Sequence, residues 1–395
     1  MYVAALFSKR ARLWVAGRRN IFSRLRDATE GHGDIVWIHA ASLGEFEQGR
    51  PIIEQIQRDY PEKKILITFY SPSGYEIRKS YHGADWVFYL PLDTPRSARR
   101  FVETVKPGVA IFIKYEFWYN FLNRLCRSGC KTYLISAIFR PDSIFFRPHG
   151  GLFRRMLRFF DHIFVQDSDS LELLKGIGVN NVTVAGDTRF DRVAAIVSSI
   201  KPLDAIERFK GDSEIFIAGS TWPADEDIML QAIAANREMK FIIAPHEIDS
   251  ERIENFIECC PRPAVCYSDF RTDPDIADAE VLIIDTIGIL SSVYQYAGIS
   301  YIGGGFGAGI HNTLEAATFG IPIAFGPNYR KFREACEMIE LGCARPIANY
   351  GELQKWMDEV HSDGIHYEKL CRIAREYVVS HGGATSIILS RIDFQ

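Results

Sequence analysis

Acidic side chains follow two runs of strand-forming residues, at Glu45 and Glu116. Glu45 comes a short loop of small residues after the apolar run 35–39, and Glu116 comes almost directly after Val109–Ile113. A carboxylate at the end of a buried strand can act as a general base, which helps a weakly nucleophilic hydroxyl group to react near neutral pH. The first half of the chain therefore offers two carboxylates for acid–base chemistry.

Both carboxylates also have a structural interpretation. Ser42 and Glu45 have the spacing of a capping box, in which each side chain binds a backbone amide at a helix N-terminus. Glu116 equally fits the N-terminal cap of the next helix, with Trp118 packed in the core. The residues alone do not decide between these roles, so both interpretations stay open.

A third loop, 218–226, joins a strand to a helix and carries Ser220 and Thr221. Hydroxyl groups before a helix with proline in its first turn are typical of an anion site, because free amides and the positive end of the helix dipole point toward the ligand. A plain serine or threonine cap is an equal alternative. His246 follows the strand 240–244 and could donate to a phosphate there, although a lone histidine is more often structural.

Glycine is concentrated in the loop 303–309, where five of seven residues are glycine. Such a loop lets the backbone approach a ligand closely, and a helix predicted over 311–319 would present its amides to the same ligand. A polar pair at the start of that helix fits either a cap or the recognition of a ribose diol. The density of glycine favours a ligand-binding loop. The residues predicted to bind a ligand here are Gly305, Gly307, Asn312 and Glu315.

Several classes of protein are disfavoured. The glycine loop is not a strict G-x-G-x-x-G with an acidic residue ~20 positions later, which argues against nicotinamide binding, and a hydrolase G-x-S-x-G is absent. No metal-ligand motif is evident, and the eight cysteines lack a C-x-x-C pair and suit a reducing compartment. A net charge of −4 argues against a nucleic-acid binder. No apolar run approaches the ~18–20 residues that span a bilayer.

The elements that must position these loops alternate between short apolar strands and helical segments, which is typical of parallel α/β domains. We predict two doubly wound domains, 1–200 and 213–395, joined by a linker within 198–212. Ligands of such domains bind in loops at the carboxyl ends of the strands, so we expect the loops to face a shared cleft. The predicted strands are 35–39, 64–69, 87–89, 109–113, 131–136, 162–165, 182–185, 214–218, 240–244, 281–284, 299–302 and 321–325.

The N-terminal stretch is strongly basic. It carries no acidic residue before Asp27, and such a segment is attracted to an anionic membrane surface. A solvated basic helix is the alternative. The seven basic residues are Lys9, Arg10, Arg12, Arg18, Arg19, Arg24 and Arg26.

Taken together, these segments resemble the Kdo transferases, which add 3-deoxy-D-manno-octulosonic acid (Kdo) to lipid A precursors in Gram-negative bacteria. The matching strings occur in the family order and run from about residue 12 to the C-terminus. They are HAASLGE at 39–45, PLD at 91–93, YEFW at 115–118, GDTRFD at 186–191, AGST at 218–221, PH at 245–246, the glycine-rich 303–315 and FGP at 325–327.

The resemblance implies a GT-B glycosyltransferase with two Rossmann-like domains. The N-terminal domain would bind the acceptor, the C-terminal domain would bind the donor CMP-Kdo, and a C-terminal helix would pack back on the N-terminal domain. Transfer would be inverting and metal-independent, with Glu45 as the general base and Glu116 shaping the acceptor or donor sugar site. The donor would be held by Ser220, Thr221 and His246 at the phosphate, by Asn312 and Glu315 at the nucleoside, and by Arg189, where the family usually has lysine, as a balancing charge.

The sequence departs from the family pattern in two places. Lys114 and Tyr119 replace the usual Glu and Pro of the string E-T-E-L-W-P-N, and the apolar segment 1–7 is much shorter than the common family anchor. We therefore expect peripheral attachment to the cytoplasmic face of the bacterial inner membrane through the basic N-terminus. Another GT-B enzyme that uses a UDP-sugar, either a transferase or an epimerase, is the alternative, and a non-catalytic nucleotide-binding scaffold is a third possibility.

Overall fold

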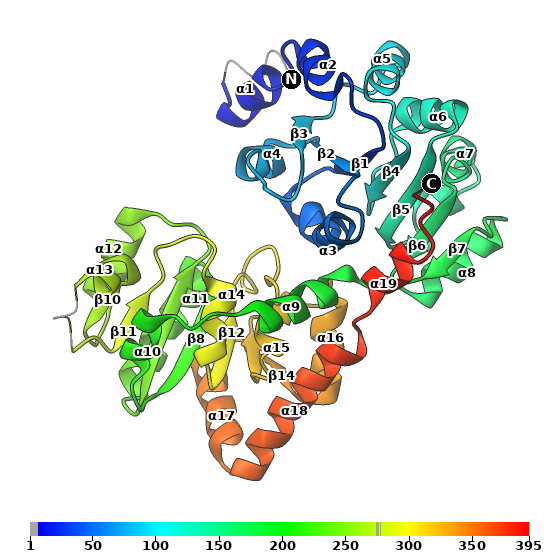
Figure 1. Cartoon of the computed structure of the whole chain (residues 1–395). Coiled ribbons are helices and arrows are strands. Elements are labelled where there is room, and N and C mark those ends of the chain that lie inside the picture. Colours follow the sequence, from blue (N-terminus) through cyan, green and yellow to red (C-terminus); the bar gives the residue numbers. More distant parts are fainter. Residues whose placement is uncertain (1–6, 274–275, 277, 395) are drawn as a thin grey trace. The chain divides into compact units, whose positions relative to one another are not determined.

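The computed structural model describes residues 7–273, 276 and 278–394, so the apolar residues 1–6 lie outside the described chain. The chain divides into two compact units (Figure 1). Unit 1 comprises Met1–Arg192 and His381–Gln395, and unit 2 comprises Val193–Ser380. Each unit contains one seven-stranded sheet in which all neighbouring strands are parallel, so the predicted α/β class is confirmed.

The sheet of unit 1 has the strand order β3-β2-β1-β4-β5-β6-β7. Its strands are β1 Ile35–Ala40, β2 Lys64–Phe69, β3 Trp86–Tyr89, β4 Val109–Ile113, β5 Lys131–Ala137, β6 His162–Val165 and β7 Val182–Val184. Its helices are α1 Lys9–Ala16, α2 Ile21–Thr29, α3 Leu43–Asp59, α4 Pro72–Arg78, α5 Pro95–Val105, α6 Tyr119–Ser128, the 3₁₀ turn η2 Ile144–Phe146, α7 Gly151–Leu157, α8 Ser168–Gly176 and α19 Ala384–Leu389.

The sheet of unit 2 has the order β10-β11-β9-β8-β12-β13-β14. Its strands are β8 Glu214–Thr221, β9 Met239–Pro245, β10 Ala264–Cys266, β11 Val281–Ile283, β12 Ile299–Ile302, β13 Ile323–Phe325 and β14 Ala344–Pro346. Its helices are α10 Asp204–Lys210, α11 Pro223–Ala235, α12 Ser250–Cys259, α13 Tyr267–Thr272, α14 Leu290–Val293, η3 Tyr294–Tyr296, α15 Leu314–Ala317, α16 Arg333–Leu341, α17 Tyr350–His361 and α18 Gly364–Ser380, while α9 Thr188–Ser199 crosses the boundary between the units.

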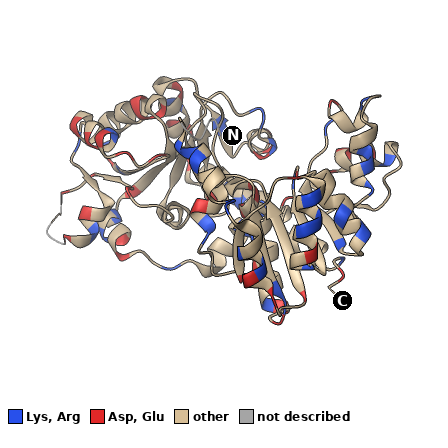
Figure 2. Ribbon diagram, turned by 90° about the horizontal axis from the view of Figure 1, so that it is seen from above, with Lys and Arg blue, Asp and Glu red and all other residues tan. Residues whose placement is uncertain are grey.

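The central strands are buried on both faces, as expected for a parallel sheet covered by helices. All six residues of β1 and all five of β4 are buried. Charged residues therefore lie mainly on helices and loops, and the strands carry few of them (Figure 2). The amphipathic helix α5 shows the complementary pattern, because Ala98, Phe101 and Val105 are buried while Arg96 and Arg99 are exposed.

The strand order places the chemistry-bearing loops at the points where each sheet changes winding direction. In unit 1 this point lies between β1 and β4, the strands that precede Glu45 and Glu116. In unit 2 it lies between β8 and β12, the strands that precede Trp222 and the glycine loop 303–309. In open α/β sheets this switch point is where ligands bind, so the topology itself selects these loops.

The division of the chain differs from the predicted boundaries at both ends of unit 2. The segment 381–394 belongs to unit 1, because Ile388 is fully buried among residues of its core and the Asp191 carboxylate accepts hydrogen bonds from the amides of Gly383, at 2.5 Å, and Thr385, at 2.6 Å. The C-terminal helix thus packs back on the N-terminal unit, as predicted (Figure 1). The expected linker 198–212 instead holds α10, whose Ile206 and Phe209 are buried.

The apolar spacing of residues 145–160 predicts one continuous helix, but its first turns are not α-helical. The chain forms the 3₁₀ turn η2 and then starts α7 only at Gly151. Pro148 lacks an amide hydrogen, and Gly150 packs so closely that an added Cβ would lie 2.0 Å from the carbonyl oxygen of Ile144. Pro148 and Gly150 therefore mark this break in the sequence, although the apolar residues of the segment have helical spacing.

Part of the basic N-terminal stretch has a structural function. The Arg18 guanidinium donates to the carbonyl oxygens of Leu90 and Tyr70, both at 2.8 Å, and lies 4.0 Å from the centre of the Trp14 ring. Lys9, Arg12 and Arg19, in contrast, are exposed. Within the described chain, no helix combines the length and the apolar character needed to cross a membrane.

Candidate functional site

Glu45 and Glu116 are positioned by the carboxyl ends of adjacent strands of unit 1. β1 pairs in register with β4, so His39 lies beside Phe112, and the loops that follow these strands start next to each other. Glu45 lies in the first turn of α3, and Glu116 lies in the loop between β4 and α6. The topology thus brings together two carboxylates that are 71 positions apart in the sequence.

Glu45 forms the capping box that its spacing predicts. Its Oε2 accepts hydrogen bonds from the backbone amide of Ser42, at 2.8 Å, and from the Ser42 hydroxyl, at 3.1 Å. The side chain is only half-buried, and within the described chain its other oxygen has no hydrogen-bond donor. The capping and functional interpretations are therefore compatible, because one oxygen anchors the side chain and the other stays available.

Glu116 is almost fully buried, with 7% of its surface exposed. Its Oε2 lies 2.6 Å from Nε1 of Trp118 and 2.9 Å from Nε2 of His39, which is itself completely buried. Thr68, which pairs with His39 across strands β1 and β2, fixes the other ring nitrogen, Nδ1. The carbonyl oxygen of Thr68 lies 3.0 Å from Nδ1, and its hydroxyl lies 2.9 Å from it. Glu116 therefore binds side chains rather than capping α6 through a backbone amide.

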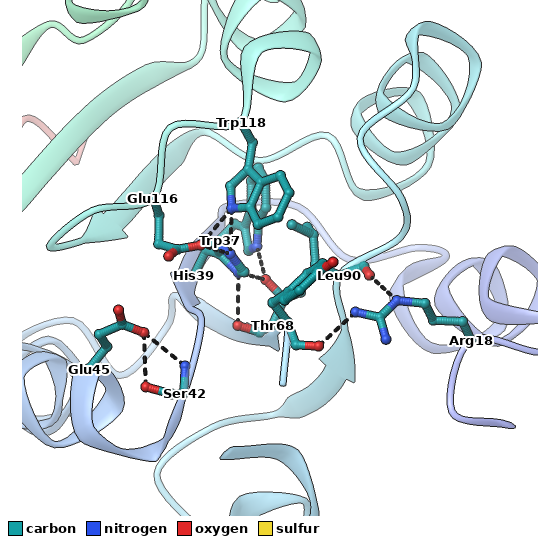
Figure 3. Close-up of polar contacts among 10 residues, drawn as sticks. Arg18, Trp37, His39, Ser42, Glu45, Thr68, Leu90, Glu116 and Trp118 are labelled. Carbon is teal, nitrogen blue, oxygen red and sulfur yellow. Dashed lines mark hydrogen bonds and ion pairs between the residues drawn. The ribbon is translucent and has the colours of Figure 1, made fainter. Parts of the chain in front are cut away.

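The two carboxylates face each other in the structure (Figure 3). Burial raises the pKa of Glu45, and the nearby negative charge of Glu116 raises this pKa further. The hydrogen bonds from Ser42 and the positive charge of Lys114 oppose this effect without cancelling it. A half-buried carboxylate with a raised pKa and one available oxygen is well suited to accept a proton from a hydroxyl group.

In unit 2, the loop after β8 is held by internal contacts more than the sequence predicted. Ser220 has a φ of 56° at a register shift of β8, and the next residue, Thr221, is completely buried and donates its hydroxyl to Glu226 at 2.9 Å. Glu226 in turn binds Arg252. The Thr221 side chain is therefore part of the scaffold, and the half-buried Ser220 is the hydroxyl left near the surface.

The buried carboxylate of Asp225 joins this loop to the glycine loop. It accepts hydrogen bonds from the amides of Trp222 and Gly304, both at 2.9 Å, and from the hydroxyl of Tyr301 at 2.6 Å. Asp225 thereby occupies amides that the anion-site prediction had left for a ligand. The burial of Tyr301 itself and the negative charge of Asp225 raise the pKa of Tyr301 strongly, so this tyrosine stays a hydrogen-bond donor.

The glycines of the loop 303–309 lie in different surroundings. A Cβ on Gly305 would lie 2.6 Å from the backbone of Gly326, and one on Gly303 would lie 2.3 Å from the carbonyl oxygen of Ser220. These two positions thus permit close packing of backbone on backbone. Gly307 is exposed, and an added Cβ there would meet only ordinary contacts, but its amide donates to the carbonyl oxygen of Gly304 at 2.9 Å and its own carbonyl oxygen accepts from Asn328 at 2.8 Å.

Three aromatic rings stack beside these loops. The rings of His246 and His311 lie 4.1 Å apart, and the Trp222 ring stacks on His246 at 5.0 Å. Trp222 also donates its Nε1 hydrogen to Nε2 of His311 at 3.0 Å. Burial, together with repulsion from His246, lowers the pKa of His311 to about 4, so this ring is neutral at physiological pH.

Asn312 and Glu315 bind each other, because the side-chain amide of Asn312 donates to Oε1 of Glu315 at 3.0 Å. The Asn312 carbonyl oxygen accepts the backbone amide of Leu314 at 3.2 Å. The helix predicted over 311–319 is reduced to α15, Leu314–Ala317, and the amide of His311 binds the carbonyl oxygen of Gly303 instead of facing a ligand. The predicted polar pair is thus present without the predicted long helix.

Comparison with known proteins connects these loops to a family. Residues 16–192 match the family model described as 3-deoxy-D-manno-octulosonic-acid transferase (kdotransferase). The 3-deoxy-D-manno-octulosonic acid transferase of Rickettsia bellii is 27% identical over 304 residues, which cover 75% of this chain and 72% of that protein. The transferase of the same name from Aquifex aeolicus is 28% identical over 335 residues, covering 83% and 86%. Residues 16–192 thus match the Kdo transferase family model, and most of the chain is similar to Kdo transferases.

The Kdo transferases are glycosyltransferases, and the fold agrees with that class. UDP-GlcNAc 2-epimerase from Neisseria meningitidis has a TM-score of 0.63 at 16% identity, with 90% of this chain and 98% of the epimerase covered. At this identity the likeness concerns the fold alone. The two-sheet GT-B class predicted for the chain is confirmed.

The structure gathers most of the predicted residues into one group in each unit. Glu45 and Glu116 lie together in unit 1, and His246 lies beside the Ser220 loop in unit 2, where its amide binds the carbonyl oxygen of Thr221 at 3.0 Å. Arg189 belongs to unit 1, where it forms an ion pair with Asp187 at 2.7 Å. The roles assigned to these side chains in catalysis and donor binding stay predictions.

Several residues that build the candidate site were assigned no catalytic or binding role from the sequence. They are His39, Trp118, Trp222, Asp225 and His311. His39 lies near the carboxyl end of β1, and His311 lies between the glycine loop and α15. The other three lie at the start of α6 or α11, so position near a strand end or a helix start was the available signal. Their partners lie up to 89 residues away in the sequence, and no local pattern identifies such pairs.

Substituting Asp225→Asn should loosen both loops of unit 2, because an amide cannot accept from three donors as the carboxylate does. We expect a loss of about 1–3 kcal/mol in the free energy of unfolding, measured by urea denaturation. Asp227→Asn, two positions along the same helix and exposed, is the matched control and should change stability by less than about 0.5 kcal/mol. Equal stability of the two variants would contradict the bridging role.

Proposed function

We propose that this protein transfers Kdo from CMP-Kdo to a hydroxyl group of a lipid A precursor in lipopolysaccharide biosynthesis, with inversion at the anomeric carbon. The observation that carries the proposal is the pair of carboxylates at the switch point of unit 1, in a chain similar to the Kdo transferases. Unit 1 would bind the acceptor and unit 2 the donor.

Glu45 is the general base in this proposal. Its Oε2 is fixed by Ser42, which orients the other oxygen without consuming it. Because burial and Glu116 raise its pKa, the carboxylate binds a proton more tightly than an ordinary glutamate does, while Lys114 limits the increase. Protonation of Glu45 should therefore abolish transfer as the pH falls through this raised pKa.

Glu116 has a different role, because its position is fixed by Trp118 and His39. One of its oxygens is occupied by these two donors, and within the described chain no donor reaches the other. We assign the free oxygen to a hydroxyl of the acceptor or of the donor sugar. Its charge also keeps Glu45 basic, so the two carboxylates act in sequence rather than interchangeably.

The donor would occupy the loops of unit 2. The Trp222, His246 and His311 rings offer stacked aromatic faces, and the pair Asn312 and Glu315 offers polar groups for a ribose diol. His246 is exposed and can donate to the leaving phosphate, as can the hydroxyl of Ser220. Donors fixed in advance can stabilise the charge that develops on a departing nucleoside monophosphate, and the proposal includes transfer without a metal ion.

We place the protein at the cytoplasmic face of the inner membrane, where such an acceptor resides. The exposed Lys9, Arg12 and Arg19 carry no carboxylate partner within the described chain, so they are available to anionic headgroups.

A second basic surface supports an anionic acceptor. It is a hollow of about 540 Å³ between α6 and α7, lined by Cys126, Gly151, Arg154, Arg155, Arg158 and Phe159.

The substitution Glu45→Gln should lower kcat for Kdo transfer by about 10²–10⁴-fold, because the amide cannot accept the hydroxyl proton. The assay uses CMP-Kdo and a tetra-acylated lipid A precursor with EDTA present, and the product is identified by its mass. Glu62→Gln, an exposed glutamate of the same unit, should keep full activity. Unimpaired transfer by Glu45→Gln would remove Glu45 from the base role, and loss of transfer in EDTA would contradict metal independence.

Nucleotide binding separates the proposal from a UDP-sugar enzyme of the same fold. CMP should raise the temperature of thermal unfolding, and UDP at the same concentration should not, since binding to the folded state alone stabilises it. The variant Asn312→Ala should reduce the CMP shift, because it removes a group assigned to the nucleoside. Stabilisation by UDP and not by CMP would favour the alternative.

Membrane attachment can be measured by sedimentation with vesicles that contain phosphatidylglycerol. Reversing the charges of Lys9, Arg12 and Arg19 to glutamate should weaken binding on the order of a hundredfold, at about 1 kcal/mol for each basic residue. Reversal of three exposed basic residues of unit 2, Lys355, Lys369 and Arg372, serves as the control and should have little effect. Equal loss in both triple variants would indicate a general charge effect instead of a basic N-terminal contact.

A further inference from the structure

The position of Glu116 depends on a completely buried histidine. His39 is 0% exposed, and its Nε2 lies 2.9 Å from Oε2 of Glu116. The same carboxylate oxygen lies 2.6 Å from Nε1 of Trp118, which always carries a hydrogen. A bond as short as this one is typical of a donor that binds an ionised acceptor, so the geometry favours a negatively charged Glu116.

The location of one hydrogen follows from these contacts. A bare imidazole nitrogen and a carboxylate oxygen would both present lone pairs and repel each other at 2.9 Å. Nε1 of Trp118 lies 3.0 Å from Nε2 of His39 and 2.6 Å from Oε2 of Glu116, so its hydrogen is nearer to the carboxylate. A second hydrogen, on Nε2 or on Oε2, removes the repulsion, and an ionised Glu116 places it on Nε2 of His39. The imidazole then donates to the carboxylate, and Trp118 donates to the same oxygen from a second direction.

Thr68 completes this arrangement on the other side of the ring. Its carbonyl oxygen lies 3.0 Å and its hydroxyl 2.9 Å from Nδ1 of His39, while the hydroxyl also accepts from Nε1 of Trp37 at 2.8 Å. The carbonyl accepts a hydrogen if Nδ1 carries one, and the hydroxyl donates one if Nδ1 is bare. Thr68 therefore holds the ring in place through Nδ1 and leaves Nε2 directed toward Glu116.

We propose that His39 is a positioning residue of the transferase, which donates its Nε2 hydrogen to Glu116 and so holds this carboxylate ionised and directed toward Glu45. The proposal rests on the proposed function, since it explains how the assigned base acquires its basicity. Without the His39 donor, an almost fully buried Glu116 would keep only the hydrogen bond from Trp118, and protonation would relieve its burial.

The consequence is measurable through Glu45. The charges of Glu116 and Lys114, both from the loop after β4, act on Glu45. Of these, Glu116 carries the negative charge that raises the pKa of Glu45, after burial itself. Neutralising Glu116 therefore lowers this pKa, and the acid limb of the activity profile moves to lower pH.

The first experiment reads the hydrogen directly and needs no substrate. Two-dimensional NMR of the full chain, labelled with ¹⁵N in histidine, distinguishes protonated from bare ring nitrogens, and the signal absent from His39→Gln identifies residue 39. We expect Nε2 of His39 to carry a hydrogen throughout the pH range in which the protein is folded. A bare Nε2 would place the hydrogen on Glu116 and overturn the proposal.

The second experiment measures the acid limb of kcat/KM for Kdo transfer. Glu116→Gln and His39→Leu should each move the limb downward, by up to about one pH unit. His39→Gln is the matched control, because its amide nitrogen replaces Nε2 as a donor, and its limb should stay in place. The double variant His39→Leu/Glu116→Gln should have the same limb as Glu116→Gln alone, because His39 acts through Glu116.

The outcomes separate this inference from the proposed function. A limb that moves in Glu116→Gln but stays fixed in His39→Leu would overturn the positioning role while leaving Glu45 as the base. Additive shifts in the double variant would overturn it as well, since His39 would then act by another route. If CMP-Kdo is not a substrate at all, the proposed function fails, and the NMR result still decides where the hydrogen lies.

Discussion

The structure of unit 1 depends on holding two carboxylates close together at the carboxyl edge of a parallel sheet. Two carboxylates in a partly buried environment repel each other, so each needs hydrogen-bond donors that stabilise its charge. Glu45 receives two from Ser42, and Glu116 receives one each from Trp118 and His39. In both cases the donors bind one oxygen and leave the other available, so the bonds that stabilise each charge also orient it.

Unit 2 applies the same principle to its ligand loops. One buried carboxylate, Asp225, binds two backbone amides and a tyrosine hydroxyl, and thereby fixes the loop after β8 to the loop after β12. Close backbone packing at Gly303 and Gly305 completes the connection. The exposed groups, among them His246 and Gly307, are then carried by loops whose positions are fixed from within.

The sequence predicted the sheets well because each central strand is a continuous apolar run. The short strands Ala264–Cys266 and Ala344–Pro346 lie at sheet edges and were missed, since three residues leave no periodic signal. The predicted loops lie close together within each unit because parallel strands gather their carboxyl ends. Their internal bonds were not predicted, because His39 and Glu116 are 77 residues apart and no local pattern pairs them.

The central claim is that Glu116 and burial make Glu45 an unusually basic carboxylate, and its most direct test is the titration of the Glu45 carboxyl carbon. With ¹³C-labelled glutamate, NMR follows this carbon in the protein without substrate, and Glu45→Gln identifies the signal. The account predicts a midpoint above the ordinary glutamate value of 4.5. A midpoint at or below that value would show that Ser42 and Lys114 outweigh burial and Glu116, and it would contradict the account.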